Sequence, residues 1–175
     1  MDRNSDAVRR AKQLAYRLLS YRGRTAHELR DRLQQRGHVA AVIEAVLHEL
    51  EAEGYVNDRK LACEWARYRL QTKPLGRRRL AWELRKRGVE GELLTEVLHT
   101  VYDEVDEAEL AEQAARRRLR STAPASSSRA PARLTRYLMG LGFEPDTIAG
   151  VLTALFPSLT SREAITEGDP PYPTC

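Results

Sequence analysis

One pattern of apolar residues around a glycine occurs three times in this 175-residue chain, and it constrains the fold more than any other feature. Residues 28–50 align with 79–101 after a shift of 51 positions, and with 133–155 after a further shift of 54. In the first copy the shared positions are Leu29, Leu33, Gly37, Ile43, Val46, Leu47 and Leu50. All seven positions hold in every copy, so the pattern predicts a tandem repeat.

Each copy has the features of two helices joined by a turn. Apolar residues three and four apart form a helical stripe on each side of the glycine. Gly37, Gly88 and Gly142 lie where a helix commonly ends in a left-handed residue, so we expect a positive φ at all three. Thr25 and Glu28 have the spacing of a capping box, which predicts the start of a helix in the first copy.

An additional amphipathic helix is predicted before each pair. In the second copy its apolar face carries Leu61, Ala62, Trp65, Ala66, Arg69 and Leu70. Asn57 and Asp58 can cap the start of this helix, and Pro145 fits the opening turn of the last helix of the chain. One three-helix unit is too small to bury its apolar face alone. We therefore predict an all-α fold in which three tandem three-helix repeats stack into an elongated array.

The repeat pattern also predicts where the domains begin and end. Repeat one is assigned to residues 8–56, repeat two to 57–105 and repeat three to 106–157. Residues 158–175 have a Gly, Pro and polar composition without an apolar stripe, which predicts a flexible C-terminal tail. Within repeat three, the Ser-, Ala- and Pro-rich segment 121–133 predicts a long, flexible connection.

Neither the composition nor the motifs support a catalytic centre. Cys63 and Cys175 are the two cysteines, and their wide separation suits a protein of the reducing cytoplasm. No apolar run is long enough to cross a membrane, and no signal peptide is expected. The four histidines form no zinc-binding pattern, and neither a phosphate-binding loop nor a nucleophile motif occurs. We expect no enzyme activity, no metal and no cofactor.

Positive charge is concentrated in the middle repeat. Residues 58–88 carry eleven Lys and Arg against three Asp and Glu, whereas residues 89–115 carry nine acids and no Lys or Arg. The corresponding positions in the other two repeats are nearly neutral. Like charges on adjacent helical turns cost stability, so a cluster confined to one repeat favours a docking surface over a solvated helix face.

The candidate partner-binding residues follow from this cluster. They are Arg24, Arg67, Arg69, Lys73, Arg77, Arg78, Arg79, Trp82, Arg85, Lys86 and Arg87. Trp82 lies two residues from both Leu80 and Leu84, so it points away from their stripe. It either packs between repeats or lies exposed among the arginines, where it would suit a protein interface or stacking on bases.

The chain resembles the RecX family of bacterial regulatory proteins in three segments, LLSYRGRTAHELRDRLQQRG, GYVNDRKLACEWARYRL and GRRRLAWELRKRGV. The resemblance is close over residues 8–100 and continues in frame to about 156. Its most specific residues are Gly54, Tyr55, Asp58, Ala62, Trp65 and Arg69. Asn57 stands where the family usually has an acid, and Leu61 where it usually has Phe.

This resemblance implies a curved array of three-helix units that binds the RecA recombinase. The protein would lie along the groove of the RecA–DNA filament and inhibit its ATPase, strand-exchange and co-protease activities. It would thereby act on homologous recombination, DNA repair and the SOS response. A monomer is expected, with single- or double-stranded DNA bound weakly or only within the filament.

A second class of function stays open at this point. The basic middle repeat could bind DNA directly, as in a helix-turn-helix-like regulator with its basic helices on phosphates. The acidic stretch after residue 89 argues against DNA contact on all sides, but not on one face. A steep salt dependence of binding to bare DNA would favour this alternative, whereas binding that needs the recombinase would favour the first.

Overall fold

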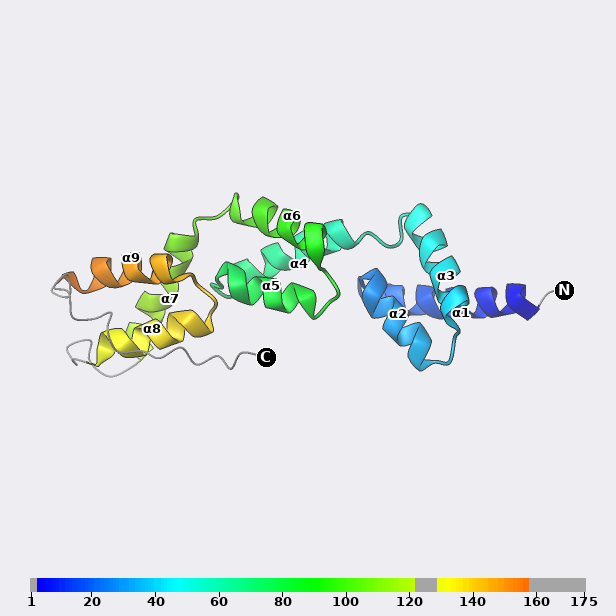
Figure 1. Cartoon of the computed structure of the whole chain (residues 1–175), viewed down its shortest axis with the longest axis horizontal. Coiled ribbons are helices and arrows are strands. Elements are labelled where there is room, and N and C mark those ends of the chain that lie inside the picture. Colours follow the sequence, from blue (N-terminus) through cyan, green and yellow to red (C-terminus); the bar gives the residue numbers. More distant parts are fainter. Residues whose placement is uncertain (1–2, 122–128, 158–175) are drawn as a thin grey trace. The chain divides into compact units, whose positions relative to one another are not determined.

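A computed structural model describes residues 3–121 and 129–157, and within these ranges it contains nine helices and no strand (Figure 1). The helices are α1 Arg3–Tyr21, α2 Ala26–Gln35, α3 Ala40–Ala52, α4 Asp58–Thr72, α5 Arg77–Arg85, α6 Gly91–Tyr102, α7 Glu107–Ser121, α8 Ala130–Gly140 and α9 Pro145–Leu155. The prediction of an all-α fold with three helices in each repeat is confirmed. The predicted tail at 158–175 lies outside the described residues.

The chain folds as two compact units. The N-terminal unit comprises Met1–Lys73 and Arg77–Val105 and carries α1 to α6. The C-terminal unit comprises Asp106–Cys175, with α7 to α9, and includes the short segment Pro74–Gly76. In this unit the amide of Gly76 donates a hydrogen bond of 2.9 Å to the carbonyl of Leu141.

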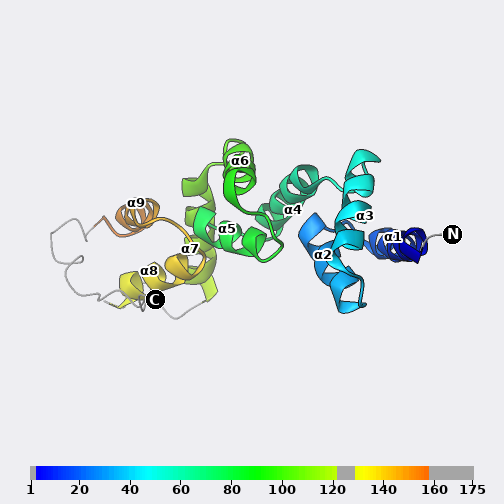
Figure 2. The ribbon, with the colours of Figure 1, turned by 45° about the vertical axis from the view of Figure 1, so that its right-hand side comes forward.

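The first repeat builds its core from the predicted stripes. Helices α1, α2 and α3 pack against one another in pairs (Figures 1 and 2). The side chain of Thr25 accepts a hydrogen bond of 3.1 Å from the amide of Glu28, which confirms the helix cap. The buried core of this repeat consists of Ala11, Ala15, Leu29, Leu33, Val42, Ile43, Val46, Leu47, Leu50 and Val56.

All three predicted turn glycines adopt the left-handed conformation. Gly37 has a φ of 83°, Gly88 of 78° and Gly142 of 83°. This region disfavours side chains with a Cβ atom, which explains why glycine recurs there. The glycines differ in their surroundings. A Cβ at Gly37 would meet nothing within 4 Å, whereas a Cβ at Gly88 would lie 2.1 Å from the Cβ of His27.

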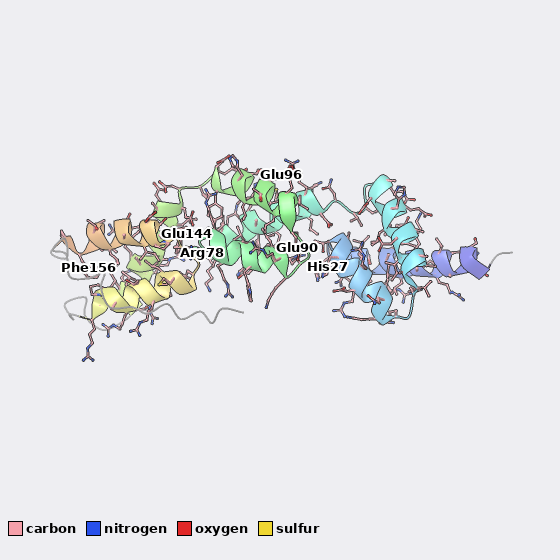
Figure 3. The ribbon with its side chains drawn as sticks, viewed as in Figure 1. His27, Arg78, Glu90, Glu96, Glu144 and Phe156 are labelled. Atoms are coloured by element: carbon pink, nitrogen blue, oxygen red, sulfur yellow. The ribbon has the colours of Figure 1, made fainter. Side chains whose placement is uncertain are left out.

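Repeats one and two are joined through the start of α2. The buried hydroxyl of Thr25 donates a hydrogen bond of 2.6 Å to the carbonyl of Arg87, which precedes Gly88. The carboxylate of Asp58 accepts one of 2.8 Å from the amide of Ala26. His27 lies beside the turn that leads to Glu90 (Figure 3). The N-terminus of α2 therefore finds hydrogen-bond partners in the second repeat as well as in its own cap.

The predicted caps of α4 are divided between two roles. Asn57 is the N-cap, and its side chain accepts a hydrogen bond of 2.9 Å from the amide of Lys60. Asp58 instead caps α2 of the neighbouring repeat through Ala26. Burial raises the pKa of the Asp58 carboxyl, and the hydrogen bond from Ala26 acts in the opposite direction.

The third repeat has the same three-helix arrangement, but the buried face of its first helix, α7, carries only small side chains. Ala111, Ala114 and Ala115 are fully buried on α7, so α8 and α9 can pack closely against it. The segment predicted as a connection over 121–133 is shorter than expected, because Ser121 ends α7 and Ala130 begins α8. A proline in the first turn of α8 is compatible with a helix, since that turn needs no amide donor there. Residues 122–128 lie outside the described ranges.

Candidate partner-binding surface

Helix α5 separates its apolar and basic residues onto different sides. Leu80 and Leu84 are fully buried and Ala81 nearly so, and these residues pack the helix into the second repeat. Because residues three, four and seven apart share one side of a helix, the remaining positions form a continuous surface. This surface, the α5 face, consists of Arg78, Arg79, Trp82 and Arg85 of the helix and of Lys86, which directly follows its last residue; all five are exposed.

Trp82 lies at the centre of the α5 face, between two cations. Trp82 is 43% exposed. Of the two predicted positions for this residue, the structure therefore shows the exposed one among the basic residues and not the one packed between repeats. The guanidinium carbon of Arg79 lies 4.3 Å from the centroid of the indole ring, and the Nζ of Lys86 lies 3.8 Å from it. Both distances are within the range of cation–π attraction.

Glu83 holds two of the predicted basic residues in place. Arg69 donates two hydrogen bonds to its carboxylate, of 2.9 and 3.0 Å, and Arg79 donates a third of 3.2 Å. Burial raises the pKa of Glu83, but these bonds outweigh it and the pKa lies below its ordinary value. The bond to Glu83 likewise raises the pKa of Arg69. Arg69 therefore acts first as a structural link between α4 and α5.

Three more of the predicted basic residues have contacts within the N-terminal unit. Arg67 bonds Glu104 at 2.8 and 2.6 Å. Arg77 lies over the ring of Tyr102 at 4.6 Å. The guanidinium carbon of Arg87 lies 5.1 Å from the ring centroid of Trp65, and its NH2 group lies 3.4 Å from Glu28. As partner-binding residues these three stay predictions, and their side chains already have contacts within the protein.

Arg85, Lys86 and Lys73 differ from those residues. Their exposed side chains form no ion pair with any residue in the described ranges. Lys73 caps the end of α4 through its backbone, where its amide donates to the carbonyl of Arg69 at 2.9 Å. Their charges are therefore available to an anionic partner, at the point where α4 ends and along α5.

The first repeat lacks this surface although it has the same frame. A shift of 51 positions places the α5 face on α2. The corresponding residues of α2 are His27, Glu28, Asp31, Gln34 and Gln35. Trp82 thus takes the place of Asp31, which lies 3.5 Å from His27 in an exposed pair. The cations are not needed for the repeat to fold, since α2 forms the same helix without them.

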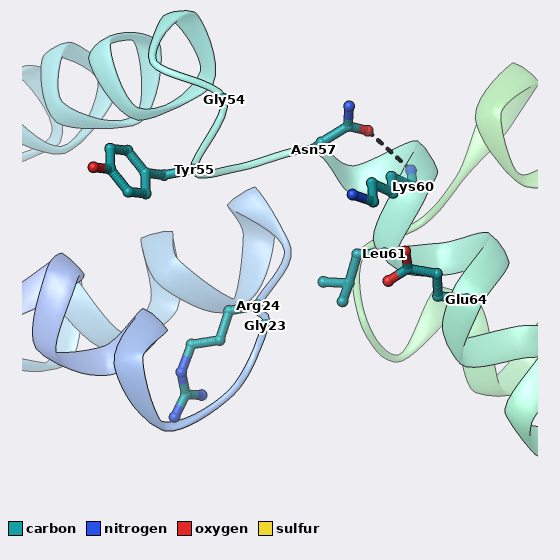
Figure 4. Close-up of a pocket in the computed structure, with 8 residues that line it drawn as sticks. All are labelled: Gly23, Arg24, Gly54, Tyr55, Asn57, Lys60, Leu61 and Glu64. Carbon is teal, nitrogen blue, oxygen red and sulfur yellow. Dashed lines mark hydrogen bonds between the residues drawn. The ribbon is translucent and has the colours of Figure 1, made fainter.

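Arg24 lies in a separate place, at a small pocket between repeats one and two (Figure 4). The pocket has a volume of about 180 Å³ and is lined by Gly23, Arg24, Gly54, Tyr55, Asn57, Lys60, Leu61 and Glu64. Arg24 donates a hydrogen bond of 3.3 Å to the carbonyl of Leu18 at the end of α1. Burial lowers the pKa of the Arg24 guanidinium, and the positive charge of Arg22 lowers it further.

Sequence reasoning did not identify Tyr55 as part of a surface. It is 59% exposed and packs edge-on against Tyr16, with ring centroids 5.1 Å apart. The hydroxyl of Tyr16 donates a 2.7 Å hydrogen bond to Glu53, which also pairs with Lys12. A tyrosine in a loop belongs to no helical or strand periodicity, so the sequence pattern does not indicate that it is exposed.

In the described ranges no cluster of three metal-ligating residues occurs, and no helix is long and apolar enough to cross a membrane.

The fold and this surface define a tandem helical-repeat protein with a cationic face on its middle repeat. Three family models match the chain in series: the first three-helix domain of RecX over residues 11–50, the second over 57–98 and the third over 104–152. The chain belongs to the RecX family of regulatory proteins.

Several bacterial proteins are similar to this chain over most of their length. A regulatory protein RecX of Mycobacterium leprae is 36% identical over 154 residues, which cover 86% of this chain and 88% of that protein. One of Mycobacterium avium is 38% identical over 131 residues, covering 75% and 73%. The crystal structure of RecX from Lactobacillus salivarius has a TM-score of 0.78 at 21% identity, covering 86% of this chain and 97% of that one. This last likeness concerns the fold alone.

Proposed function

We propose that this chain is a negative modulator of the RecA recombinase. It would bind along the groove of the RecA–DNA filament in the bacterial cytoplasm and inhibit the ATPase, strand-exchange and co-protease activities of RecA. It would act as a monomer and without a cofactor. Membership of the RecX family, with all three of its domains in series, is the observation that carries this proposal.

The α5 face supports the proposal by its chemistry. A RecA–DNA filament is rich in phosphate, and Arg85 and Lys86 offer cations that no carboxylate of the described residues neutralises. The apolar side of the same helix is fully occupied by the core of the repeat. An anionic partner can therefore bind the α5 face without any rearrangement of the fold.

The test is the rate of ATP hydrolysis by RecA on single-stranded DNA while this protein is titrated. It is added either before or after the filament assembles. If the protein blocks filament growth, we expect inhibition at less than one copy per RecA. If it binds along the groove, we expect inhibition in both orders of addition. An unchanged rate in both orders at saturating protein would refute the proposal.

Direct DNA binding without a recombinase is a second candidate, because the α5 face would suit phosphates of bare duplex DNA as well. The steepness of the salt dependence separates the two. A protein that neutralises several phosphates of bare duplex loses affinity as salt rises, with a slope of about −0.9 per phosphate contact on logarithmic axes. Tight, salt-sensitive duplex binding together with no effect on RecA would favour this candidate.

A further inference from the structure

We propose that Trp82 is a stacking site for one base of single-stranded DNA, with the cations of the α5 face on the neighbouring phosphates. This inference rests on the proposed function, since the strand would be the one within the recombinase filament. It names a contact at the level of one side chain, where the proposed function names only a surface.

The two cations beside the indole ring are held differently. Arg79 is fixed from a second direction, because its Nε donates to Glu83 at 3.2 Å while its guanidinium lies over the ring. Lys86 has no carboxylate partner among the described residues, and only the ring holds its ammonium group. A lysine has a flexible stem and a compact charge, so Lys86 can leave the ring at little cost.

This asymmetry makes a place for a base. When Lys86 moves to a phosphate, it uncovers the part of the ring that it occupied, and a base can stack there. Arg79 stays on the indole and keeps the ring fixed. The partner thus gains a stacking contact and an ion pair from one local rearrangement.

An acidic protein surface would fit the α5 face less well. A carboxylate can bind the cations and the single Nε1–H donor of the indole, but it leaves the face of the ring without a stacking partner. The first repeat shows that the position of Trp82 needs no aromatic residue for folding, since Asp31 occupies it in α2. A half-exposed indole surrounded by arginines and a lysine is instead the arrangement that binds single strands.

The experiment follows the fluorescence of Trp82 directly. The chain contains two tryptophans, so Trp65→Phe leaves Trp82 as the only indole. A 15-nucleotide oligothymidylate is titrated at low salt, and inorganic polyphosphate of equal charge serves as the control for charge alone. The proposal predicts saturable quenching by the oligonucleotide and no quenching by polyphosphate, which can draw Lys86 from the ring but has no base to stack on it.

A second variant keeps the test independent of Trp65. Trp82→Leu should weaken binding of the oligothymidylate, measured by anisotropy of a labelled strand, by about fivefold or more, since one stacked base is worth roughly 1–3 kcal/mol and 1.4 kcal/mol is tenfold. Tyr68→Leu is the matched control, because Tyr68 is a 61% exposed aromatic of α4 without a cation on its ring in the described residues. Its affinity should be unchanged.

Two results would overturn the inference. In the first, the oligonucleotide and polyphosphate act alike and Trp82→Leu binds as tightly as the parent, so that charge alone explains binding. In the second, no oligonucleotide binds while polyglutamate does, which assigns the face to an acidic protein. In either case, inhibition of RecA that persists in the ATPase assay would leave the proposed function intact, and its loss would refute that function separately.

Discussion

A methyl group at position 88 should disrupt the junction between the first two repeats. The Cβ of an alanine built at Gly88 would lie 2.1 Å from the Cβ of His27 and 2.3 Å from its Cγ. The Cβ of His27 is fixed to the backbone of α2 and cannot rotate away. The start of α2 would therefore have to shift, and with it the buried hydrogen bond of 2.6 Å from Thr25 to the carbonyl of Arg87.

Gly37 provides the matched comparison for the size of the effect. Both glycines have a left-handed φ, so Gly37→Ala and Gly88→Ala share a conformational cost of about 1–2 kcal/mol. Only Gly88→Ala adds overpacking, at about 1–3 kcal/mol, and the strain on a buried hydrogen bond, at about 1 kcal/mol. We expect Gly88→Ala to lower the free energy of unfolding by about 2–4 kcal/mol more than Gly37→Ala does.

Urea denaturation followed by circular dichroism measures this difference, and a double-mutant cycle with His27 locates its origin. His27→Gly removes the obstructing Cβ and should recover most of the excess loss in the Gly88→Ala background. His27→Ala keeps that Cβ and should recover little. If Gly88→Ala and Gly37→Ala were equally destabilising, or if both changes at His27 rescued alike, the reasoning about this junction would be wrong.

Two further predictions concern charge. Changing Arg85 and Lys86 together to Glu should weaken binding to the recombinase filament by about fivefold or more at low salt. The loss should be smaller at high salt, where charges are screened. The same change at the exposed Arg10 and Arg17 of α1 is the control and should have little effect. Equal losses for the two pairs, measured by filament pelleting, would speak against a specific α5 face. Glu83 has a lowered pKa, so its stabilising effect is complete above its ordinary pKa of 4.5 and is lost as the pH falls through its pKa in the folded protein. Glu83→Gln should therefore lose less stability than the parent between pH 5 and pH 3, as thermal melts at each pH would show; an unchanged pH dependence would contradict this.

Much of the fold could be predicted because the repeated pattern reflects local features of helices: apolar stripes, glycines at helix ends and N-caps. The apolar stripes place Leu80 and Leu84 inside, and both are fully buried. The recurring glycines mark helix ends, and their φ values agree. The cap at Asn57 also follows from residue type and position. Each of these depends on residues within one helical turn, which a sequence displays directly.

The junction between repeats could not be predicted in the same way. Asp58 looks like a cap for its own helix, yet it accepts from Ala26, 32 residues earlier in the chain. The contact between His27 and Gly88 is likewise non-local. Periodicity tells which face of a helix is buried, but it does not tell which residue of another repeat lies against that face.

The candidate surface was predicted too broadly for the same reason. The number of charges in the sequence put Arg69 and Arg85 in the same cluster. In the structure Arg69 forms hydrogen bonds with Glu83, 14 residues away, whereas Arg85 has no such partner in the described residues. For Trp82, the spacing from its apolar neighbours correctly indicated that it points off the stripe. Whether another part of the chain covers the ring depends on tertiary structure, which the spacing does not give. The 43% exposure of Trp82 shows that the ring stays accessible.

The decisive measurement for the proposed function is the affinity of this protein for the RecA filament. Labelled protein is mixed with RecA assembled on single-stranded DNA with a non-hydrolysable ATP analogue, and its anisotropy is compared with that on the same DNA without RecA. We expect saturable binding that is much tighter on the filament, and weaker binding by the Arg85→Glu, Lys86→Glu variant. Equal affinity for the filament and for the bare strand, or no binding to the filament, would contradict it.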